Sequence, residues 1–273
     1  MKKIFGIIGK PLKHSLSPTL HNYWFKKYKI DANYVLIETE EKEIKKTIEK
    51  IKNKEIQGLN ITLPYKQKVI PFIEKLVNNA KETHSVNTLY LNKEDNLIGD
   101  NTDVYGLQAG YLNKIVDINN QKALVIGAGG VSPSIIFALK KSKVKEICIV
   151  NRTHEKAVFL KKNFEFLQTI KWSELKAEIK NFDIIINATS LGLKNGDDFD
   201  FFFDNLKEKA IYIDTIYNPL ETKMIKDLKS KGIKTFNGLD MLIYQGQKSF
   251  YLWCQINPDI DDQLLDLLKK KIR

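Results

Sequence analysis

The chain has 273 residues, enough for one large or two medium-sized domains, and 43% of its residues are hydrophobic, as in globular proteins. No apolar run approaches the roughly 20 residues that span a bilayer, and the apolar start of the chain runs into Lys10-Pro11 without a cleavage-like site. We therefore expect a soluble, cytoplasmic protein with no membrane partner.

Lysine and arginine outnumber aspartate and glutamate by 44 to 33, which gives a net charge of +11. The lysines are spread along the chain, mostly on expected helix faces, and no zinc finger or basic–aromatic tract accompanies them. We therefore expect no nucleic-acid partner, although the positive field favours anionic ligands. Cys148 and Cys254 are isolated, so they predict neither a metal site nor a disulfide.

The first hundred residues alternate between strand and helix patterns. Residues 41–52 carry Ile44, Ile48 and Ile51 on one helical face. The polar break at 93–96 separates the two strands of a predicted hairpin. The expected strands are 4–9, 34–38, 59–62, 88–91 and 97–99, and the expected helices are 17–28, 41–52 and one opened by Pro64.

A second series of elements begins near residue 121. From Gly238 the chain is expected to be helical to its end, apart from a break at Asn257-Pro258. The helical stretches between the strands of this series argue for a parallel, doubly wound sheet and an α/β fold class. The order of the motifs puts a domain boundary near residue 103. The expected strands are 123–126, 146–150, 183–187, 211–214 and 235–236.

A glycine-rich turn follows the apolar run 123–126. In Gly127-Ala128-Gly129-Gly130, glycines fill the first two places of the G-x-G-x-x-G fingerprint, and Ser132 stands in the third. A strand that ends in such a turn and continues as a helix aims backbone N–H groups at a pyrophosphate. The alternatives are a tight turn without a ligand or the similar turn of methyltransferases. The order of strand, turn, helix and basic strand tip favours a nucleotide site.

The tip of the next strand indicates which nucleotide binds. NAD sites usually carry Asp or Glu about 20 residues past the glycines, where the carboxylate accepts hydrogen bonds from the ribose 2′-OH. This chain has Asn151-Arg152-Thr153 there, with Lys156 one helical turn later. Two cations suit a 2′-phosphate, so the pattern predicts an NADP-dependent oxidoreductase.

Two hydroxyls, those of Ser15 and Ser17, follow the first strand. Because they are two residues apart in a loop, they can converge on one carboxylate or polyol. The alternative is that Ser17 only caps the following helix, with Pro18 in its first position, and the residues alone favour that alternative. His21 is expected to be a structural residue of the same helix.

Lys66 is the sharper candidate for catalysis. It falls in the first turn of the helix that Pro64 is expected to open, where the helix dipole and partial burial favour a neutral amine. Such an amine exchanges protons near neutral pH. Asp103, where a strand gives way to a helix, is the expected partner of Lys66, and Asn87 adds a polar group in the same half. The alternatives are an exposed surface lysine and an aspartate that only caps its helix.

Polar residues also follow strands of the second half, at 187–192 and 214–219. The carboxyl ends of parallel strands lie at one edge of a sheet, where doubly wound folds bind ligands. Gln245 lies one helical turn past Met241 in the C-terminal helix. It either satisfies backbone groups or points into a cleft between the domains.

Taken in order, these motifs resemble the shikimate dehydrogenase family. No single motif is decisive, but the ordered set is highly specific and extends over nearly the whole chain. The matching motifs are Ser15-Leu16-Ser17, Asn60-Ile61-Thr62-Leu63-Pro64-Tyr65-Lys66, Val86-Asn87-Thr88, Asp100-Asn101-Thr102-Asp103, Gly127-Ala128-Gly129-Gly130, Asn151-Arg152-Thr153, Asn187-Ala188-Thr189-Ser190-Leu191-Gly192 and Met241-Leu242-Ile243-Tyr244-Gln245.

The resemblance implies reversible reduction of 3-dehydroshikimate to shikimate with NADPH, a step of chorismate and aromatic amino-acid biosynthesis. It implies an N-terminal α/β substrate domain and a doubly wound Rossmann-type NADP-binding domain, with the C-terminal helices returning to the first domain. The expected domains are 1–103 plus 239–273 and 104–238. We expect small-molecule ligands and a monomer or homodimer.

The resemblance also implies roles for individual residues, with Lys66 and Asp103 as the catalytic pair and no metal. Ser15 and Ser17 would bind the substrate carboxylate. The residues implied to hold the substrate hydroxyls and ring are Thr62, Lys66, Asn87, Asp103, Tyr217 and Gln245. Those implied to bind NADP are Gly127, Ala128, Gly129, Gly130, Val131, Asn151, Arg152, Thr153, Lys156, Thr215 and Gly238.

Three departures from the family pattern stand out. Val131-Ser132-Pro133 replaces the small residues that commonly follow the glycines, which bears on the geometry of the phosphate turn. His84 stands where glycine is usual. Lys156 replaces a frequent arginine, which keeps the charge but loses the bidentate fork.

Two other functions remain open at this point. One is a relative that also oxidises quinate or uses NAD; Arg152 opposes NAD, and Ser17 fits shikimate better than the threonine of some quinate users. The other, of a different class, is a non-catalytic nucleotide-binding regulator. The intact pair of Lys66 and Asp103 argues against it.

Overall fold

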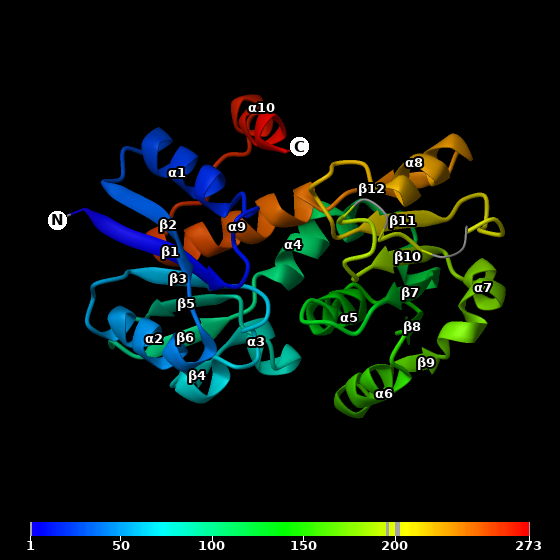
Figure 1. Ribbon diagram of the computed structural model, residues 1–273, viewed down its shortest axis with the longest axis horizontal. Coiled ribbons are helices and arrows are strands. Elements are labelled where there is room, and N and C mark those ends of the chain that lie inside the picture. Colours follow the sequence, from blue (N-terminus) through cyan, green and yellow to red (C-terminus); the bar gives the residue numbers. More distant parts are fainter. Residues whose placement is uncertain (1, 195–196, 200–202, 273) are drawn as a thin grey trace. The chain divides into compact units, whose positions relative to one another are not determined.

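The computed structural model describes residues 2–194, 197–199 and 203–272 (Figure 1). The chain folds into two compact units. The first comprises the residues up to Gly106 together with Leu242–Lys271, and the second comprises Leu107–Met241 with Ile272. Each unit is built on its own six-stranded sheet, which confirms the predicted two-part α/β fold.

The sheet of the first unit has the strand order β2-β1-β3-β5-β6-β4. β1 pairs in parallel with β2 and β3, whereas β3, β5 and β6 are antiparallel neighbours and β4 lies parallel to β6. The predicted hairpin is confirmed as β5 and β6. The strands are β1 (Lys3–Gly9), β2 (Ala32–Glu38), β3 (Gly58–Ile61), β4 (Lys75–Leu76), β5 (Thr88–Leu91) and β6 (Leu97–Asp100).

Helices cover both faces of this sheet (Figure 1). Side chains of a strand point alternately to the two faces. Ile8 of β1 therefore packs with Ile44 of α2, while Phe5 contacts Phe25 of α1 and Trp253 of α9 on the other face. The helices are α1 (Ser17–Lys27), α2 (Ile44–Lys52), α3 (Asn78–Thr83), the first turn of α4 (Asp103–Gly110), most of α9 (Leu239–Cys254) and α10 (Asp262–Lys271), with 3₁₀ turns η1 (Glu41–Glu43) and η2 (Ile70–Phe72).

The second unit has six parallel strands in the order β12-β11-β10-β7-β8-β9. The predicted doubly wound sheet is confirmed, and its order reverses between β7 and β10, the switch point where such sheets bind ligands. The elements are β7 (Lys122–Ile126), β8 (Glu146–Val150), β9 (Gln168–Ile170), β10 (Ile184–Asn187), β11 (Ile211–Asp214), β12 (Lys234–Phe236), α5 (Ser132–Lys141), α6 (His154–Asn163), α7 (Leu175–Glu178), α8 (Lys223–Ser230), η3 (Leu112–Lys114), η4 (Ile118–Asn120), η5 (Trp172–Glu174) and η6 (Ile179–Asn181).

The helix predicted to begin at Pro64 is wrong. Residues 63–69 form successive turns, in which the Tyr65 N–H donates to the Thr62 carbonyl and the Val69 N–H donates to the Tyr65 carbonyl. The segment then continues into the 3₁₀ turn η2, where Pro71 has no N–H to donate. Lys66 therefore does not lie at a helix N-terminus, and no helix dipole acts on its amine.

The sequence patterns also missed the shortest elements. β4, β9 and α3 have two, three and six residues, too few to show a period. α3 ends at His84, which has a left-handed backbone with φ of 45°. Glycine is the usual residue in that conformation at a helix end, which explains why a glycine was expected at this position.

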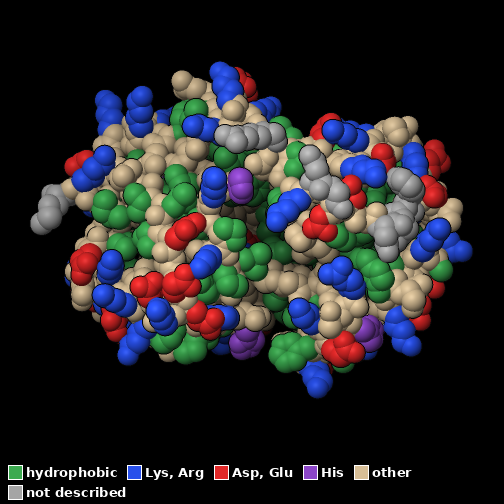
Figure 2. All heavy atoms as spheres, in the orientation of Figure 1, with side chains coloured by type: hydrophobic (Ala, Val, Ile, Leu, Met, Phe, Trp, Pro, Cys, Tyr) green, Lys and Arg blue, Asp and Glu red, His purple; other side chains and the backbone are tan. Residues whose placement is uncertain are grey.

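The surface carries charges of both signs. Figure 2 shows lysine and arginine side chains interspersed with aspartate and glutamate over the face in view, rather than gathered in one basic patch. Among the described residues, no helix has the length and apolar character needed to cross a membrane. The same residues include no group of histidine, cysteine and acidic side chains arranged to hold a metal ion.

Asp214, at the carboxyl end of β11, is a fully buried carboxylate that pairs with no cation of the described residues. Its Oδ1 accepts hydrogen bonds from the Ile216 N–H at 3.0 Å and from Asn187 Nδ2 at 3.1 Å. Its Oδ2 faces the hydroxyls of Thr222 at 3.0 Å and Tyr212 at 3.4 Å. Loss of hydration raises the pKa of Asp214 from 3.8 to about 6 despite these donors.

Asp214 should therefore make the protein less stable as the pH rises. Its folded pKa lies above its unfolded pKa, so its favourable contribution is complete below pH 3.8 and is lost as the pH rises through about 6. At about 1.36 kcal/mol per pKa unit, the change amounts to about 3 kcal/mol. Asp214→Asn should abolish this pH dependence of stability, because the two hydroxyls facing Oδ2 can rotate to accept from an amide. Urea unfolding between pH 4.5 and 7.5 measures this.

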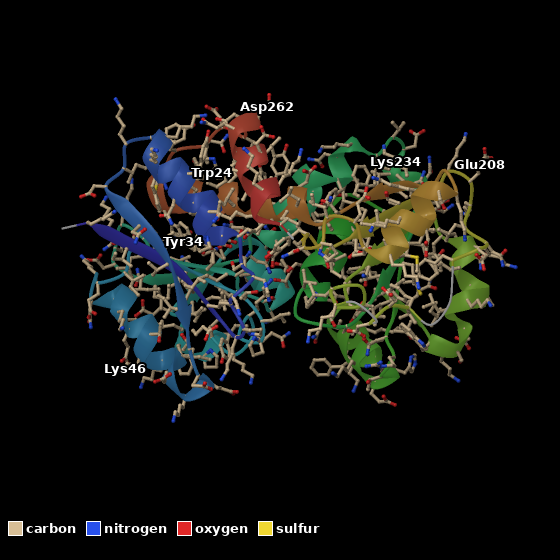
Figure 3. All side chains as sticks on the ribbon, turned by 45° about the horizontal axis from the view of Figure 1, so that its top comes forward. Trp24, Tyr34, Lys46, Glu208, Lys234 and Asp262 are labelled. Atoms are coloured by element: carbon tan, nitrogen blue, oxygen red, sulfur yellow. The ribbon has the colours of Figure 1, made fainter. Side chains whose placement is uncertain are left out.

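The control is Glu208→Gln, which neutralises an exposed carboxylate of the same unit (Figure 3). The stability difference between Asp214→Asn and the wild type should grow with pH, whereas that of Glu208→Gln should stay flat. A difference for Asp214→Asn that is constant over this pH range contradicts the raised pKa.

Candidate active site

Lys66 and Asp103 form a buried ion pair in the first unit. Lys66 Nζ lies 2.6 Å from Asp103 Oδ2, and the two residues are only 9% and 6% exposed. Asp103 is the first residue of α4, separated from β6 by Asn101-Thr102, and Lys66 belongs to the turns after β3. The Val86 N–H donates to the Lys66 carbonyl at 2.8 Å and fixes the turn against the segment that carries Asn87, just before β5. The alternative of an exposed surface lysine is therefore wrong.

Asn87 holds the other oxygen of Asp103. Its Nδ2 donates to Asp103 Oδ1 at 2.9 Å and approaches Gln245 Oε1 at 3.4 Å. Gln245 Nε2 donates to the Leu242 carbonyl of its own helix at 2.9 Å. The fold thus brings together four of the predicted site residues, Lys66, Asn87, Asp103 and Gln245, from sequence positions up to 179 residues apart.

Neither serine near the start of α1 caps that helix with its side chain. Leu16 is the N-cap residue, and Ser17 makes no side-chain cap. The Ser15 hydroxyl accepts from the Ser17 N–H at 3.3 Å. Ser17 is buried beside Tyr34. Burial raises the pKa of Tyr34, and its hydrogen bond with the Ser17 hydroxyl lowers that pKa in part. The alternative that Ser17 only caps the helix is therefore wrong.

His21 is a buried aromatic residue of the first unit. Its ring stacks on Tyr34 with centroids 4.5 Å apart, and neither ring nitrogen has a hydrogen-bond partner among the described residues. Burial lowers the pKa of His21 to about 3, so the ring is neutral. This fits the structural role expected for it.

Thr62 and Tyr217 are half-buried residues of loops. Thr62 directly follows β3, and its N–H donates to the Ile8 carbonyl at 2.9 Å. Tyr217 belongs to the second unit, in the loop after β11. Their substrate roles stay predictions.

The glycine turn of the second unit lies between β7 and α5. Gly127 has a φ of 109°, and a Cβ there would lie 2.7 Å from Thr189 Cγ2, so only glycine suits this position. A Cβ on Gly129 would meet nothing closer than the Ala188 carbonyl oxygen at 3.9 Å. Gly129 therefore borders open space, as expected of a glycine that lets a pyrophosphate approach the backbone.

Ser132 completes this turn in place of the third glycine. It is fully buried, and its hydroxyl donates to the Gly127 carbonyl at 2.8 Å and accepts from the Gly129 N–H at 3.0 Å. Pro133 occupies the first turn of α5, as predicted. Serine in the third place of the fingerprint thus closes the turn by a side-chain bridge. This bridge uses the Gly129 N–H as one of its donors.

The tip of β8 presents two exposed cations. Asn151 Oδ1 accepts from the Ala128 N–H at 3.0 Å and joins this tip to the glycine turn. Arg152 and Lys156 are exposed, and no described carboxylate forms an ion pair with either. Thr153 is the N-cap of α6, without a side-chain cap bond. A free guanidinium and ammonium beside a glycine turn suit a phosphate group.

Thr215 and Gly238 approach each other at the carboxyl edge of the same sheet. The Thr215 hydroxyl donates to the Asn187 carbonyl at 2.9 Å, and the Gly238 N–H donates to the Ile216 carbonyl at 2.8 Å. A Cβ on Gly238 would lie 2.2 Å from the Thr215 carbonyl oxygen. The close backbone contact alone thus accounts for glycine at this position.

Sequence reasoning missed several residues that position the site. Asn60, Thr88, Thr102 and Ser249 are all buried and bonded to one another around Asn87. Thr88 and Thr102 stood beside predicted site residues in their motifs. Ser249 lies one helical turn past Gln245, and this spacing was the available signal.

The second unit is a parallel sheet in this strand order with a glycine-rich first turn, and the other unit carries a buried lysine–carboxylate pair. Together these features define a dinucleotide-dependent dehydrogenase of the α/β class. Comparison with known proteins gives the family. Residues 7–89 match the family described as "Shikimate dehydrogenase substrate binding domain", and residues 111–194 match "Shikimate / quinate 5-dehydrogenase".

Whole-chain relatives agree with these matches. A protein named shikimate dehydrogenase (NADP(+)) from Pelagibacter ubique is 46% identical over 98% of this chain and 99% of its own length. The crystal structure of shikimate dehydrogenase from Aquifex aeolicus superposes with a TM-score of 0.89 at 33% identity, covering 100% of this chain and 98% of its own. Shikimate 5-dehydrogenase from Thermus thermophilus, in complex with NADP(H) and shikimate, gives 0.88 at 27% identity, covering 99% and 100%. The chain belongs to the shikimate dehydrogenase family.

Gly238 and Gly129 should respond differently to alanine. Gly238→Ala forces a methyl into the Thr215 backbone and should lower the free energy of unfolding by about 1–3 kcal/mol. Gly129→Ala meets open space at a compatible φ and should leave stability within about 1 kcal/mol of the wild type. Chemical denaturation of both variants measures this. Equal destabilisation of the two would contradict the close contact at Gly238.

Proposed function

We propose that this protein catalyses the reversible NADP-dependent reduction of 3-dehydroshikimate to shikimate. The observation that carries the proposal is the buried pair of Lys66 and Asp103, 2.6 Å apart, in a chain of the shikimate dehydrogenase family. A lysine and a carboxylate buried together hold a proton at a defined place, which carbonyl reduction requires at the substrate oxygen.

Bound NADPH supplies the hydride that reduces the ketone carbon at C3. The Lys66 ammonium donates a proton to the ketone oxygen during reduction, and its amine accepts that proton during shikimate oxidation. Asp103 holds Lys66 in place and hydrogen-bonds a substrate hydroxyl. Asn87 fixes the Asp103 carboxylate through Oδ1, which leaves Oδ2 for Lys66. The burial of the pair keeps water from competing for this proton.

The remaining predicted residues divide by ligand in this proposal. In the substrate-binding unit, Ser15 and Ser17 bind the carboxylate. The substrate hydroxyls and ring are held by Thr62, Asn87, Asp103, Tyr217 and Gln245. The cofactor is held by Gly127 to Val131, Asn151 to Thr153, Lys156, Thr215 and Gly238. The domain limits of 1–103 with 239–273 and of 104–238 belong to the same proposal, as does a cytoplasmic location.

The second unit offers what an NADP site needs. The open space at Gly129 admits a pyrophosphate, and Arg152 and Lys156 are unpaired cations among the described residues. The tip of β8 carries no Asp or Glu that would hold the 2′-OH of NAD. These features support NADP over NAD, and with Ser17 they favour shikimate over quinate.

An assay at 340 nm with shikimate and quinate, each with NADP and NAD, tests the proposal. Shikimate with NADP should react much faster than any other combination. Turnover of quinate equal to or greater than that of shikimate would overturn the assignment, and no turnover of either would favour a non-catalytic regulator.

Arg152→Ala should weaken NADP use selectively. A charge-assisted hydrogen bond contributes about 1.5–3 kcal/mol, so the KM for NADP should rise roughly tenfold or more. NAD use should change little, because NAD lacks the 2′-phosphate. A matched loss with both cofactors would show that Arg152 does not bind this phosphate.

Lys66→Ala should lower kcat by about 10²–10⁴, the usual contribution of a general acid or base. The shikimate KM should change far less, because the proton moves in the transition state. Asp103→Asn should also be severe, and the double variant should be less impaired than the product of the two single effects. Steady-state kinetics and melting temperatures of all three measure this. A Lys66→Ala enzyme with normal kcat would rule out the mechanism.

A further inference from the structure

A closed cluster of polar side chains lies between the sheet of the first unit and α9. Asn60, Thr88, Thr102 and Ser249 are each at most 4% exposed, and Ser249 is completely buried. Ser249 Oγ lies 3.0 Å from Asn60 Nδ2, 2.8 Å from Thr88 Oγ1 and 3.1 Å from Thr102 Oγ1. One hydroxyl of α9 thus joins side chains of β3, β5 and the segment after β6.

Hydrogen bonds lead through this cluster from Tyr34 to Ser249. The Tyr34 hydroxyl donates to Asn60 Oδ1 at 2.7 Å, which turns the Asn60 amide so that its Nδ2 donates to Ser249. Tyr34 lies on β2 beneath α1, the helix that carries Trp24 (Figure 3). The Ser249 hydroxyl accepts from Asn60 and lies 2.8 Å from Thr88 Oγ1, a contact in which either oxygen can be the donor.

Thr88 connects this cluster to the proposed active site. Its hydroxyl donates to Asn87 Oδ1 at 2.9 Å, and the Thr102 N–H donates to the same oxygen at 2.8 Å. Because Asn87 Oδ1 accepts from these two donors, the amide is oriented so that its Nδ2 faces Asp103 Oδ1 at 2.9 Å. The series of donors therefore ends on the carboxylate that pairs with Lys66.

Packing alone does not require this arrangement. A serine in a helix can satisfy its hydroxyl on the backbone one turn earlier, and Ser249 Oγ does lie 3.1 Å from the Gln245 carbonyl. The three additional partners, from three other segments, connect the hydroxyl to the group around Asn87. Buried polar networks that are fully satisfied fix one geometry, because each unmade bond leaves an expensive unpaired group.

We infer that Ser249 is a positioning residue of the proposed reaction, acting through Thr88 and Asn87 to hold Asp103 in the orientation that presents it to Lys66. The inference rests on the proposed function for its kinetic consequence. It adds to the site a residue of α9 that contacts neither of the proposed catalytic groups.

Ser249→Ala tests the inference, with Ser85→Ala as the matched control. Ser85 is also a completely buried serine of the first unit, but its hydroxyl has no hydrogen-bond partner among the described residues. Ser249→Ala should lower kcat for shikimate oxidation roughly three- to tenfold. The KM values for shikimate and NADP should stay within about twofold, because the loss falls on proton transfer.

A solvent isotope effect separates positioning from loss of packing. In D₂O, kcat of Ser249→Ala should fall by a larger factor than that of the wild type, because proton transfer to or from Lys66 becomes more rate-limiting. Ser85→Ala should keep the wild-type kcat and isotope effect. Tyr34→Phe keeps the ring but removes the donor to Asn60 and the partner of Ser17, so it should shift both quantities in the same direction and also raise the shikimate KM.

A wild-type kcat in Ser249→Ala, or an equal loss in Ser85→Ala, would overturn the inference. A double-mutant cycle of Ser249→Ala with Asp103→Asn, followed by urea unfolding, needs no substrate. Non-additive unfolding free energies support the connection and additive ones contradict it. A non-additive cycle in a protein that does not oxidise shikimate would leave the connection standing and remove the proposed function instead.

Discussion

The burial of the Lys66–Asp103 pair is the constraint on which the first unit depends. Each charge taken from water costs several kcal/mol, and a short contact offsets this only when the remaining lone pairs are satisfied. Asp103 Oδ1 therefore needs its own donor, and Asn87 supplies it. Asn87 in turn needs donors on its oxygen, which come from Thr88 and the Thr102 backbone. The polar residues at these positions follow from a single buried ion pair.

Asp214 shows the other outcome of the same constraint. It is buried as deeply as Asp103 and accepts from several donors, but no described cation faces it, and its pKa rises to about 6. Its partners tie the ends of β10 and β11 to the start of α8, so this carboxylate holds loops in place. Burial of a carboxylate therefore does not by itself indicate chemistry. The facing lysine distinguishes Asp103, because it gives the site a proton that can move.

Sequence patterns predicted the fold well where elements were long or apolar, since the parallel strands of the second unit are buried runs flanked by helices. They failed at Pro64, because the same proline signal marks helix starts and tight turns. Lys66 was found for the wrong local reason, since its environment comes from Asp103 rather than from a helix dipole. For Ser249 the sequence offered only its one-turn spacing from Gln245, because its partners lie 147 to 189 residues away in sequence.

Asparagines lie at or next to strand ends in both units and fix the groups around them. Asn87 fixes Asp103, Asn151 fixes the glycine turn, and Asn187 fixes the ends of β10 and β11. An amide offers donors and an acceptor at once, so it can orient backbone and side chains without a second charge. An aspartate at position 151 would repel a phosphate and pair with Arg152. The neutral amide keeps the geometry of the turn and leaves that guanidinium available, so the residue that shapes the turn also sets the charge of the site.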